Sequence, residues 1–238
     1  SSNATAEDHI NFITSEVEYL EKDPMIFRYA WFMTYSRAYQ VNLLDVGEGI
    51  LTDLGKVYTQ MSSFDSTYYH PCYTLIPAAQ YQNAANIKLR PSTHNTDMLM
   101  LRDLSTGAWA EYLVDIPQTD NYDITFQLVC KSNTKIEIYQ DDELKTTLQP
   151  EATTGSEFDT WGERMVNVPL TKGQHRLKIR SAGRMFYLES LQIGTIPSDI
   201  PSVQGSTGRI QKFLHNGQLT IIQNGHQYNA QGQIINNR

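Results

Sequence analysis

Several features that would place a protein in a familiar class are missing from this chain of 238 residues. No apolar run is long enough to span a bilayer, so the sequence predicts no membrane span. The net charge is −7, which argues against a nucleic-acid partner held by electrostatics. The six histidines are scattered without ligand spacing, so no Cys/His metal cluster is expected. Ser-His-Asp spacing, phosphate loops and redox motifs are also missing.

Cysteine is scarce as well, and the two residues Cys72 and Cys130 are too few to identify a redox compartment. Cys130 continues a period-two apolar series that starts at Tyr122, so we expect it to be buried. Two buried thiols are our interpretation, and a disulfide is the alternative.

A pair of facing carboxylates, which glycoside hydrolysis needs, is not indicated anywhere in the chain. The acidic residues of the N-terminal region fall on or just after an expected helix face, or in a loop. We therefore predict no catalytic residue in this chain, and leave open whether the chain itself is an enzyme.

A secretory signal peptide is missing too. Residues 1–4, Ser-Ser-Asn-Ala, are typical of a tag remnant, so we expect an excised fragment. A missing signal then gives no information about where the parent protein resides.

Residues 5–65 have helical periodicity. Thr5 and Asp8 predict a helix start, and Asp23 before a proline predicts its end. The apolar run at 25–33 indicates a strand covered on both faces, as in a parallel sheet or barrel. Thr52 is expected to cap a second helix.

Residues 72–196 change to a period of two. Tyr112, Val114 and Ile116 alternate with more polar neighbours, and turn signals separate several such runs. This pattern predicts an antiparallel sandwich. The last strand changes phase, which a bulge near Ser190 would explain.

The end of the chain is expected to be a linker at 197–208 followed by a tail at 209–238. The tail contains Asn216-Gly217 and Asn224-Gly225, which are strong hairpin signals. We expect a small β-meander there.

The middle region resembles family 6 carbohydrate-binding modules over about residues 75–194. The resemblance rests on three pieces in order: residues 76–81, the Gly-x-Trp-x-x-Tyr run at 107–112, and the Leu-x-x-Gly-x-His-x-Leu run at 170–177. It implies a jelly-roll β-sandwich that binds a polysaccharide, commonly β-glucan or xylan. The predicted fold class is thus mainly β, with an N-terminal α/β segment and a C-terminal β-meander.

The same resemblance implies a sugar site among loops at one edge of the sandwich. Two of its usual aromatic positions fall on Asp103, which cannot stack on a sugar, and Phe158, which can. A usual Asn position falls on Tyr187. Trp161 and Trp109 are further candidates, with a packing role as the alternative for each.

Family 6 modules often hold a structural calcium, and the resemblance assigns two of its ligand positions to Ala79 and Glu189. Because Ala79 has lost the carboxylate, we expect no calcium through this pattern, and no other cofactor.

The first region resembles the end of a glycoside hydrolase barrel of family 128. Residues 28–32, 42–45 and 51–58 carry this resemblance, which implies that Trp31 lines a sugar cleft when the rest of the barrel is present. A core position is the alternative for Trp31. The tail is similar to C-terminal tails on secreted proteins of Bacteroidetes, which implies a secreted or cell-surface parent.

Three functions are compatible with these observations. The first is non-catalytic binding of a poly- or oligosaccharide that targets a parent glycoside hydrolase to its substrate. The second is a C-terminal fragment of a hydrolase whose barrel lies upstream, and the third is a structural or adhesion sandwich that binds no sugar. Residues 5–65 need an apolar cover, so we expect them to pack on the sandwich or on a second copy.

Overall fold

The computed structural model describes two compact units, residues 1–196 and 197–238, within which the described positions are 4–31, 34–35, 41–45, 47–154, 158–194, 211–215, 218–223 and 226–228. Within these positions, no helix has both the length and the apolar character to cross a membrane. The predicted linker at 197–208 and both Asn-Gly pairs of the tail lie outside the described residues.

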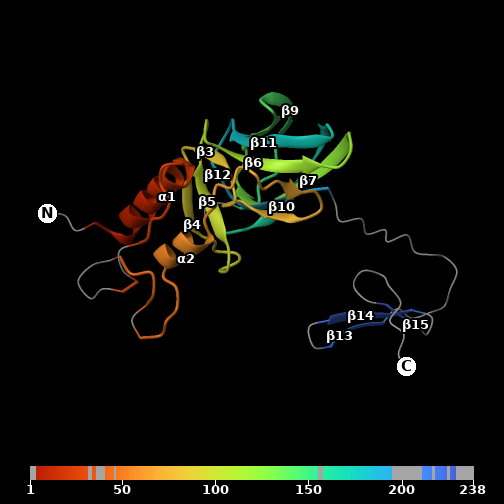
Figure 1. Ribbon diagram of the computed structural model, residues 1–238. Helices are drawn as coiled ribbons and strands as arrows, with labels where there is room; N and C mark the ends of the chain where they lie inside the picture. Colours follow the sequence, from red (N-terminus) through yellow and green to blue (C-terminus); the bar gives the residue numbers. More distant parts are fainter. Residues whose placement is uncertain are drawn as a thin grey trace. The chain divides into compact units, whose positions relative to one another are not determined.

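Two six-stranded sheets form the sandwich of the first unit (Figure 1). The first sheet has the order β1 (His70–Pro71), β6 (Trp109–Ile116), β11 (Gly173–Ser181), β8 (Ile136–Gln140), β9 (Glu143–Leu148), with β3 (Asn83–Ala85) also paired to β6. The second has the order β10 (Gly162–Leu170), β7 (Asp120–Cys130), β12 (Phe186–Ile193), β5 (Leu99–Leu104), β4 (Lys88–Pro91), with β2 (Leu75–Pro77) also paired to β12. Apart from the parallel pair β1 and β6, these strands are antiparallel. The β-sandwich prediction is confirmed.

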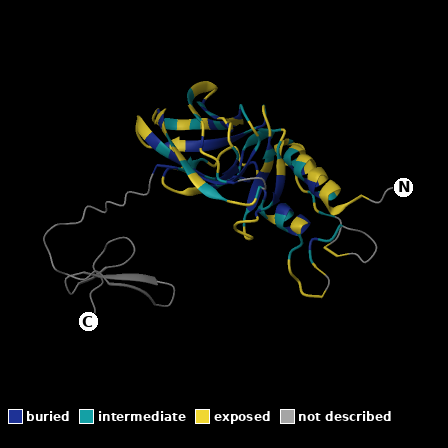
Figure 2. Cartoon of the chain, turned by 180° about the vertical axis from the view of Figure 1, so that it is seen from behind, coloured by how far each residue is buried: buried dark blue, intermediate teal, exposed yellow. Residues whose placement is uncertain are grey.

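The core lies between the sheets, where alternate side chains of the strands point inward and are buried (Figure 2). Tyr112, Val114 and Ile116 of β6 are all buried, as the period-two pattern predicts. In β12 the pairing with β7 shifts register between Leu188 and Ser190, which confirms the predicted bulge.

Both cysteines are buried free thiols, so the interpretation of two buried thiols is confirmed. Burial raises the pKa of the Cys72 thiol to about 11 and also raises the pKa of Cys130.

Two helices precede the sandwich, α1 (Ala6–Lys22) and α2 (Asp53–Gln60). Both predicted caps are present: Thr5 and Asp8 form a reciprocal capping box, and Thr52 accepts from the Gly55 N–H at 3.1 Å. The helices pack on each other and on β4. Arg90 of β4 fixes α1 through an ion pair of 2.6 Å with Glu7.

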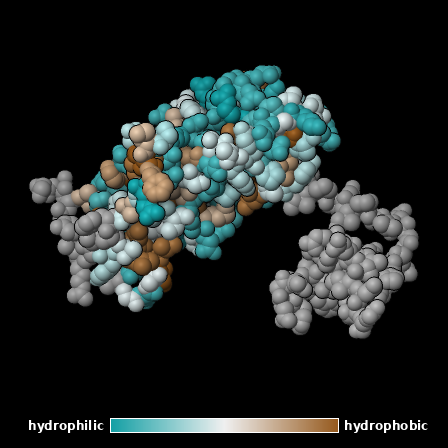
Figure 3. Space-filling view, viewed as in Figure 1, coloured by the Kyte–Doolittle hydropathy of each residue, from teal (hydrophilic) through white to brown (hydrophobic). Residues whose placement is uncertain are grey.

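The expected strand at 25–33 is wrong for the part that the structure describes. Residues 26–31 have no strand pairing, and Met25 and Phe27 are 88% and 92% exposed. The apolar run matches a buried parallel strand in composition, but such a strand forms only between two neighbouring strands. Figure 3 shows the hydrophobic surface gathered toward the end that carries α1 and α2, whereas the end near β9 and β11 is hydrophilic.

The second unit contains a three-stranded antiparallel sheet of β13 (Gln211–His215), β14 (Gln218–Gln223) and β15 (His226–Tyr228). Each pair of strands is separated by two residues, so the strand order agrees with the predicted β-meander.

Candidate functional site

A small aromatic cluster lies on the outer face of the second sheet. Strand alternation produces it: Met100, Val129 and Tyr187 point away from the core because their strand neighbours point into it. Phe158 and Trp161, from the segment between β9 and β10, pack against these three residues. The structure therefore brings together three of the predicted site residues, Phe158, Tyr187 and Trp161.

The rings of Phe158 and Tyr187 stack with their centroids 4.8 Å apart and an interplanar angle of 28°. Cations lie beside both rings: Lys131 Nζ is 4.3 Å from the Phe158 centroid, and the Arg102 guanidinium carbon is 5.7 Å from that of Tyr187. Tyr187 is only 8% exposed, whereas Phe158 is half-buried. Of this pair, Phe158 offers the greater ring surface to a ligand.

Trp161 is held in place by the segment that follows β4. Its indole Nε1 donates to Thr93 Oγ1 at 3.0 Å, and its ring lies 5.8 Å from the His94 imidazole. His94 Nδ1 in turn lies 2.9 Å from the buried carboxylate of Glu189. The orientation of the half-buried indole is thus fixed before any ligand arrives.

The two positions that the resemblance links to calcium do not fit this ion. Ala79 is buried and offers no side-chain oxygen. The Glu189 carboxylate accepts hydrogen bonds from Ser92 Oγ and from the Asn95 N–H, in addition to its contact with His94. Across the described residues, no three metal-ligating side chains gather.

Trp109 lies apart from the cluster, on the first sheet. Lys178 Nζ is 5.2 Å from its ring centroid, and the two residues line a polar hollow of about 290 Å³ with Tyr139 and Arg180. Trp109 and Tyr139 are both half-buried. This hollow is a separate surface with aromatic and charged groups.

Trp31 is also separate from the cluster, whereas Asp103 reaches its margin through an ion pair of 3.7 Å with Arg102. Trp31 lines an apolar hollow with Phe12, and its Nε1 donates to the Val41 carbonyl at 2.9 Å. Asp103 has a positive φ of 58° and forms an ion pair of 3.2 Å with Lys88. Within the described part of the chain, no stacking contact or hydrogen bond joins either residue directly to Phe158.

Sequence reasoning missed the polar groups around the cluster, namely Arg102, Lys131 and His94. The position of Arg102 beside Tyr187 is a result of the strand order, because β5 pairs with β12. His94 reaches Trp161 across 67 positions of sequence, between two loops. No local spacing signals such contacts.

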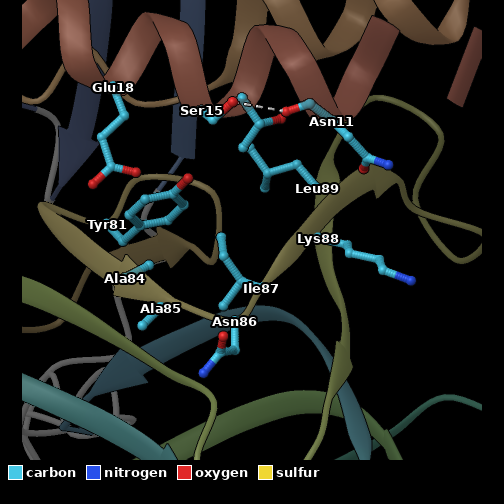
Figure 4. Close-up of a pocket in the computed structure, with 11 residues that line it drawn as sticks. Asn11, Ser15, Glu18, Tyr81, Ala84, Ala85, Asn86, Ile87, Lys88 and Leu89 are labelled. Carbon is cyan, nitrogen blue, oxygen red and sulfur yellow. Dashed lines mark hydrogen bonds between the residues drawn. The ribbon is translucent and has the colours of Figure 1, made fainter. Parts of the chain in front are cut away.

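A further hollow of about 340 Å³ lies between α1 and residues 84–89 (Figure 4). Glu18 and Tyr81 point toward each other in this view. Tyr81 is fully buried and is the only aromatic residue among those that line the hollow. With no exposed ring face, this hollow cannot stack on a sugar.

A sandwich that carries such an aromatic cluster is compatible with the class of carbohydrate-binding modules. Residues 77–195, half of the chain, match the model of the carbohydrate binding module family 6. The chain belongs to this family. Residues 1–58 match the model described as glycosyl hydrolase catalytic core, which confirms the second resemblance. No curated protein matches the chain.

Solved structures similar to this chain include three modules. The CBM6cm-2 module of Cellvibrio mixtus lichenase 5A, in complex with cellotriose, is 18% identical with a TM-score of 0.47, covering 52% of this chain and 98% of that one. A β-1,3-glucan-binding module from Bacillus halodurans is 16% identical with a TM-score of 0.49, covering 54% and 100%. CsCBM6-3 from Clostridium stercorarium, in complex with cellobiose, is 14% identical with a TM-score of 0.48, covering 54% and 98%.

Proposed function

We propose that the chain binds a polysaccharide through the cluster of Phe158, Trp161 and Tyr187 and makes no catalytic contribution of its own. The observation that carries the proposal is the meeting of these rings on an outer sheet face, beside charged side chains. Pyranose rings present apolar C–H faces that stack on flat aromatic groups, while their hydroxyls need hydrogen-bonding partners.

In this site Phe158 and Trp161 supply the contact surface, because both are half-buried and Tyr187 is nearly covered. Tyr187 supports Phe158 from one side. Arg102, Lys131 and His94 provide donors for sugar hydroxyls at the margin of the cluster. Family membership supports β-glucan or a related polysaccharide as the ligand.

The module would hold an attached glycoside hydrolase on its substrate by raising the effective concentration of enzyme and polymer. The match of residues 1–58 to a hydrolase core supports a parent protein that carries the rest of a catalytic barrel. A polysaccharide substrate also favours a secreted or cell-surface parent.

Residues 5–65 supply the surface for that neighbour. Phe12, Tyr19, Met25 and Phe27 are each more than half exposed in this segment. Apolar side chains gathered in this way mark a protein contact. A second copy of the chain is the alternative neighbour, and a dimer in light scattering would favour it over the barrel.

Affinity electrophoresis in gels containing laminarin, lichenan, xylan or arabinan tests the binding proposal. We expect at least one gel to retard the protein, and Phe158→Ala and Trp161→Ala each to weaken retardation about tenfold or more. Phe27→Ala is the matched control, because Phe27 is exposed and lies outside the module.

One observation favours the alternative of a structural sandwich without sugar binding. The Phe158 ring contacts both Tyr187 and Lys131, so part of its surface is already occupied within the protein. If none of the gels retards the protein and a glycan array is also blank, this alternative replaces the binding function.

A further inference from the structure

A second polar hollow lies beside the first sheet, and most of its lining comes from a segment that neither family match covers. The segment from residue 61 to 70 connects α2 to β1, between the hydrolase match ending at 58 and the module match starting at 77. Together with Gln80, Gln82 and Leu113 of β6, it lines a hollow of about 330 Å³. This volume is at the small end of the range for ligand sites.

The segment is fixed by side-chain amides from the module. Gln82 Nε2 donates to the Phe64 carbonyl at 3.0 Å, and Gln80 Nε2 donates to the Gln60 carbonyl at 2.9 Å. Phe64 is buried with a positive φ of 53°, and its ring lies edge-on to Tyr81 at 5.7 Å. A strained residue held this way marks a rigid, preformed segment.

Tyr68 provides an aromatic surface at the hollow. It lines the hollow and is 56% exposed. The imidazole of His70 lies edge-on to it, with centroids 5.0 Å apart and planes at 83°. Since the contact is edge-on and over half of the residue is open, ring surface remains for stacking on a pyranose.

Acceptors for sugar hydroxyls surround this ring. With both amide nitrogens committed, Gln80 and Gln82 each keep a side-chain oxygen that accepts no hydrogen bond within the described residues. Asp65 accepts from the Thr67 N–H and hydroxyl through Oδ1, at 2.8 and 2.6 Å, which leaves Oδ2 as an acceptor. These groups match the donors of a polyhydroxylated ligand.

The charge at the hollow selects among sugars. No lysine or arginine is among the residues that line it, all of which the structure describes. Burial lowers the pKa of His70, which keeps the imidazole neutral near pH 7, whereas Asp65 is ionised. A uronic or sulfated sugar would therefore meet a carboxylate and no cation.

From this geometry we propose that the hollow at Tyr68 is a second carbohydrate site, which takes one neutral sugar unit and discriminates against acidic sugars. The inference rests on the proposed carbohydrate binding but uses the other sheet, so the two sites can fail separately. A module with two sites on different sheets gains avidity for a polymer.

Isothermal titration calorimetry of the full chain with laminarihexaose, cellohexaose and xylohexaose tests this inference. We expect two binding events for the hexaose that binds. Tyr68→Ala should weaken one of them about tenfold, Tyr68→Phe should retain it because the ring remains, and Phe158→Ala should remove the other. Trigalacturonate should not bind at the Tyr68 site. Circular dichroism checks that each variant folds.

The remaining outcomes distinguish the Tyr68 site from the Phe158 site. If Tyr68→Ala leaves every event unchanged while Phe158→Ala abolishes binding, the Tyr68 site is wrong and the proposed function stands. If only Tyr68→Ala weakens binding, the Phe158 site is wrong and the Tyr68 site stands. Tight binding of trigalacturonate that Tyr68→Ala removes would overturn the predicted selectivity. No binding of any hexaose at millimolar concentration overturns both proposals.

Discussion

Two buried tyrosines differ in whether the hydroxyl group has a hydrogen-bond partner. Tyr81 and Tyr112 are both fully buried, and burial raises the pKa of each. The Tyr112 hydroxyl donates to the Ala78 carbonyl at 2.9 Å. The Tyr81 hydroxyl has no hydrogen-bond partner within the described residues.

Replacing each with phenylalanine should therefore give different results. We expect Tyr112→Phe to lower the free energy of unfolding by about 0.5–1.5 kcal/mol, because it removes a buried hydrogen bond. Tyr81→Phe should be neutral or stabilising, since it removes an unsatisfied hydroxyl. Urea unfolding of the two variants, measured with wild type, checks this. An equal loss in both would mean that Tyr81 does have a partner, such as a bound water.

The buried thiols make stability depend on alkaline pH. In the unfolded chain a thiol ionises near pH 9, whereas the folded structure raises the pKa of Cys72 to about 11. The folded state therefore retains a proton that the unfolded state loses, so the free energy of unfolding should fall as pH rises from about 9 to about 11. Urea midpoints across this range, compared with Cys72→Ala, measure the effect. A slope unchanged in Cys72→Ala would assign it to other groups.

For single residues, the sequence predicted which positions are candidates for the site, but not which side chains surround them in the fold. Phe158 and Tyr187 are candidates because the family pattern assigns a position to each, and the structure brings their rings together. Their cationic neighbours Lys131 and Arg102 lie just after β7 and in β5, the two strands that flank β12 in the folded sheet. No one-dimensional pattern contains that register.

Helix α2 provides a case in which local preference and packing oppose each other. Gly55 is in its first turn, where alanine would ordinarily stabilise a helix by about 1 kcal/mol. A Cβ at this position would overlap the carbonyl oxygen of Leu43 and come within 2.9 Å of its carbonyl carbon. That carbonyl is itself fixed, because it accepts from the Thr52 N–H at 2.9 Å.

Gly55→Ala should therefore destabilise the protein by more than about 1 kcal/mol despite the gain in propensity. Ser15→Ala in the exposed face of α1 is the control, and we expect it to be neutral or slightly stabilising. Thermal unfolding followed by circular dichroism measures both. Gly55→Ala with an unchanged melting temperature would show that the Leu43 segment shifts without cost.

Helices, caps and strands that depend on the local sequence were predictable, whereas a strand that depends on partner strands elsewhere in the chain was not. The caps at Thr5 and Thr52 and the alternation in β6 are local signals, and each is present. The run at 25–33 has the composition of a parallel strand, but its described part pairs with no other strand. Strand formation there needs partners that the pattern does not encode.

For the whole molecule, the N-terminal helices and the sandwich share one hydrophobic core. Ile10, Ile13 and Val17 of α1 belong to the same buried cluster as Leu89 of β4 and Leu101 of β5. The family boundaries at 58 and 77 therefore do not coincide with a break in packing. Residues 1–196 form one compact unit in spite of their two family matches.

Shortening the chain tests this cooperative packing. Residues 1–196 alone should melt in a single transition at about the temperature of the same unit in the full chain, since 197–238 is a separate unit. Residues 72–196 alone should melt at least about 8 °C lower. Each lost buried apolar side chain contributes about 1.5–3 kcal/mol to the free energy of unfolding, and each kcal/mol shifts the melting temperature by about 2–4 °C. Differential scanning calorimetry of the three chains gives these temperatures. Equal melting temperatures for 72–196 and 1–196 would mean that the helices dock without stabilising the module. Two transitions in 1–196 would mean that the helices unfold independently of the sandwich.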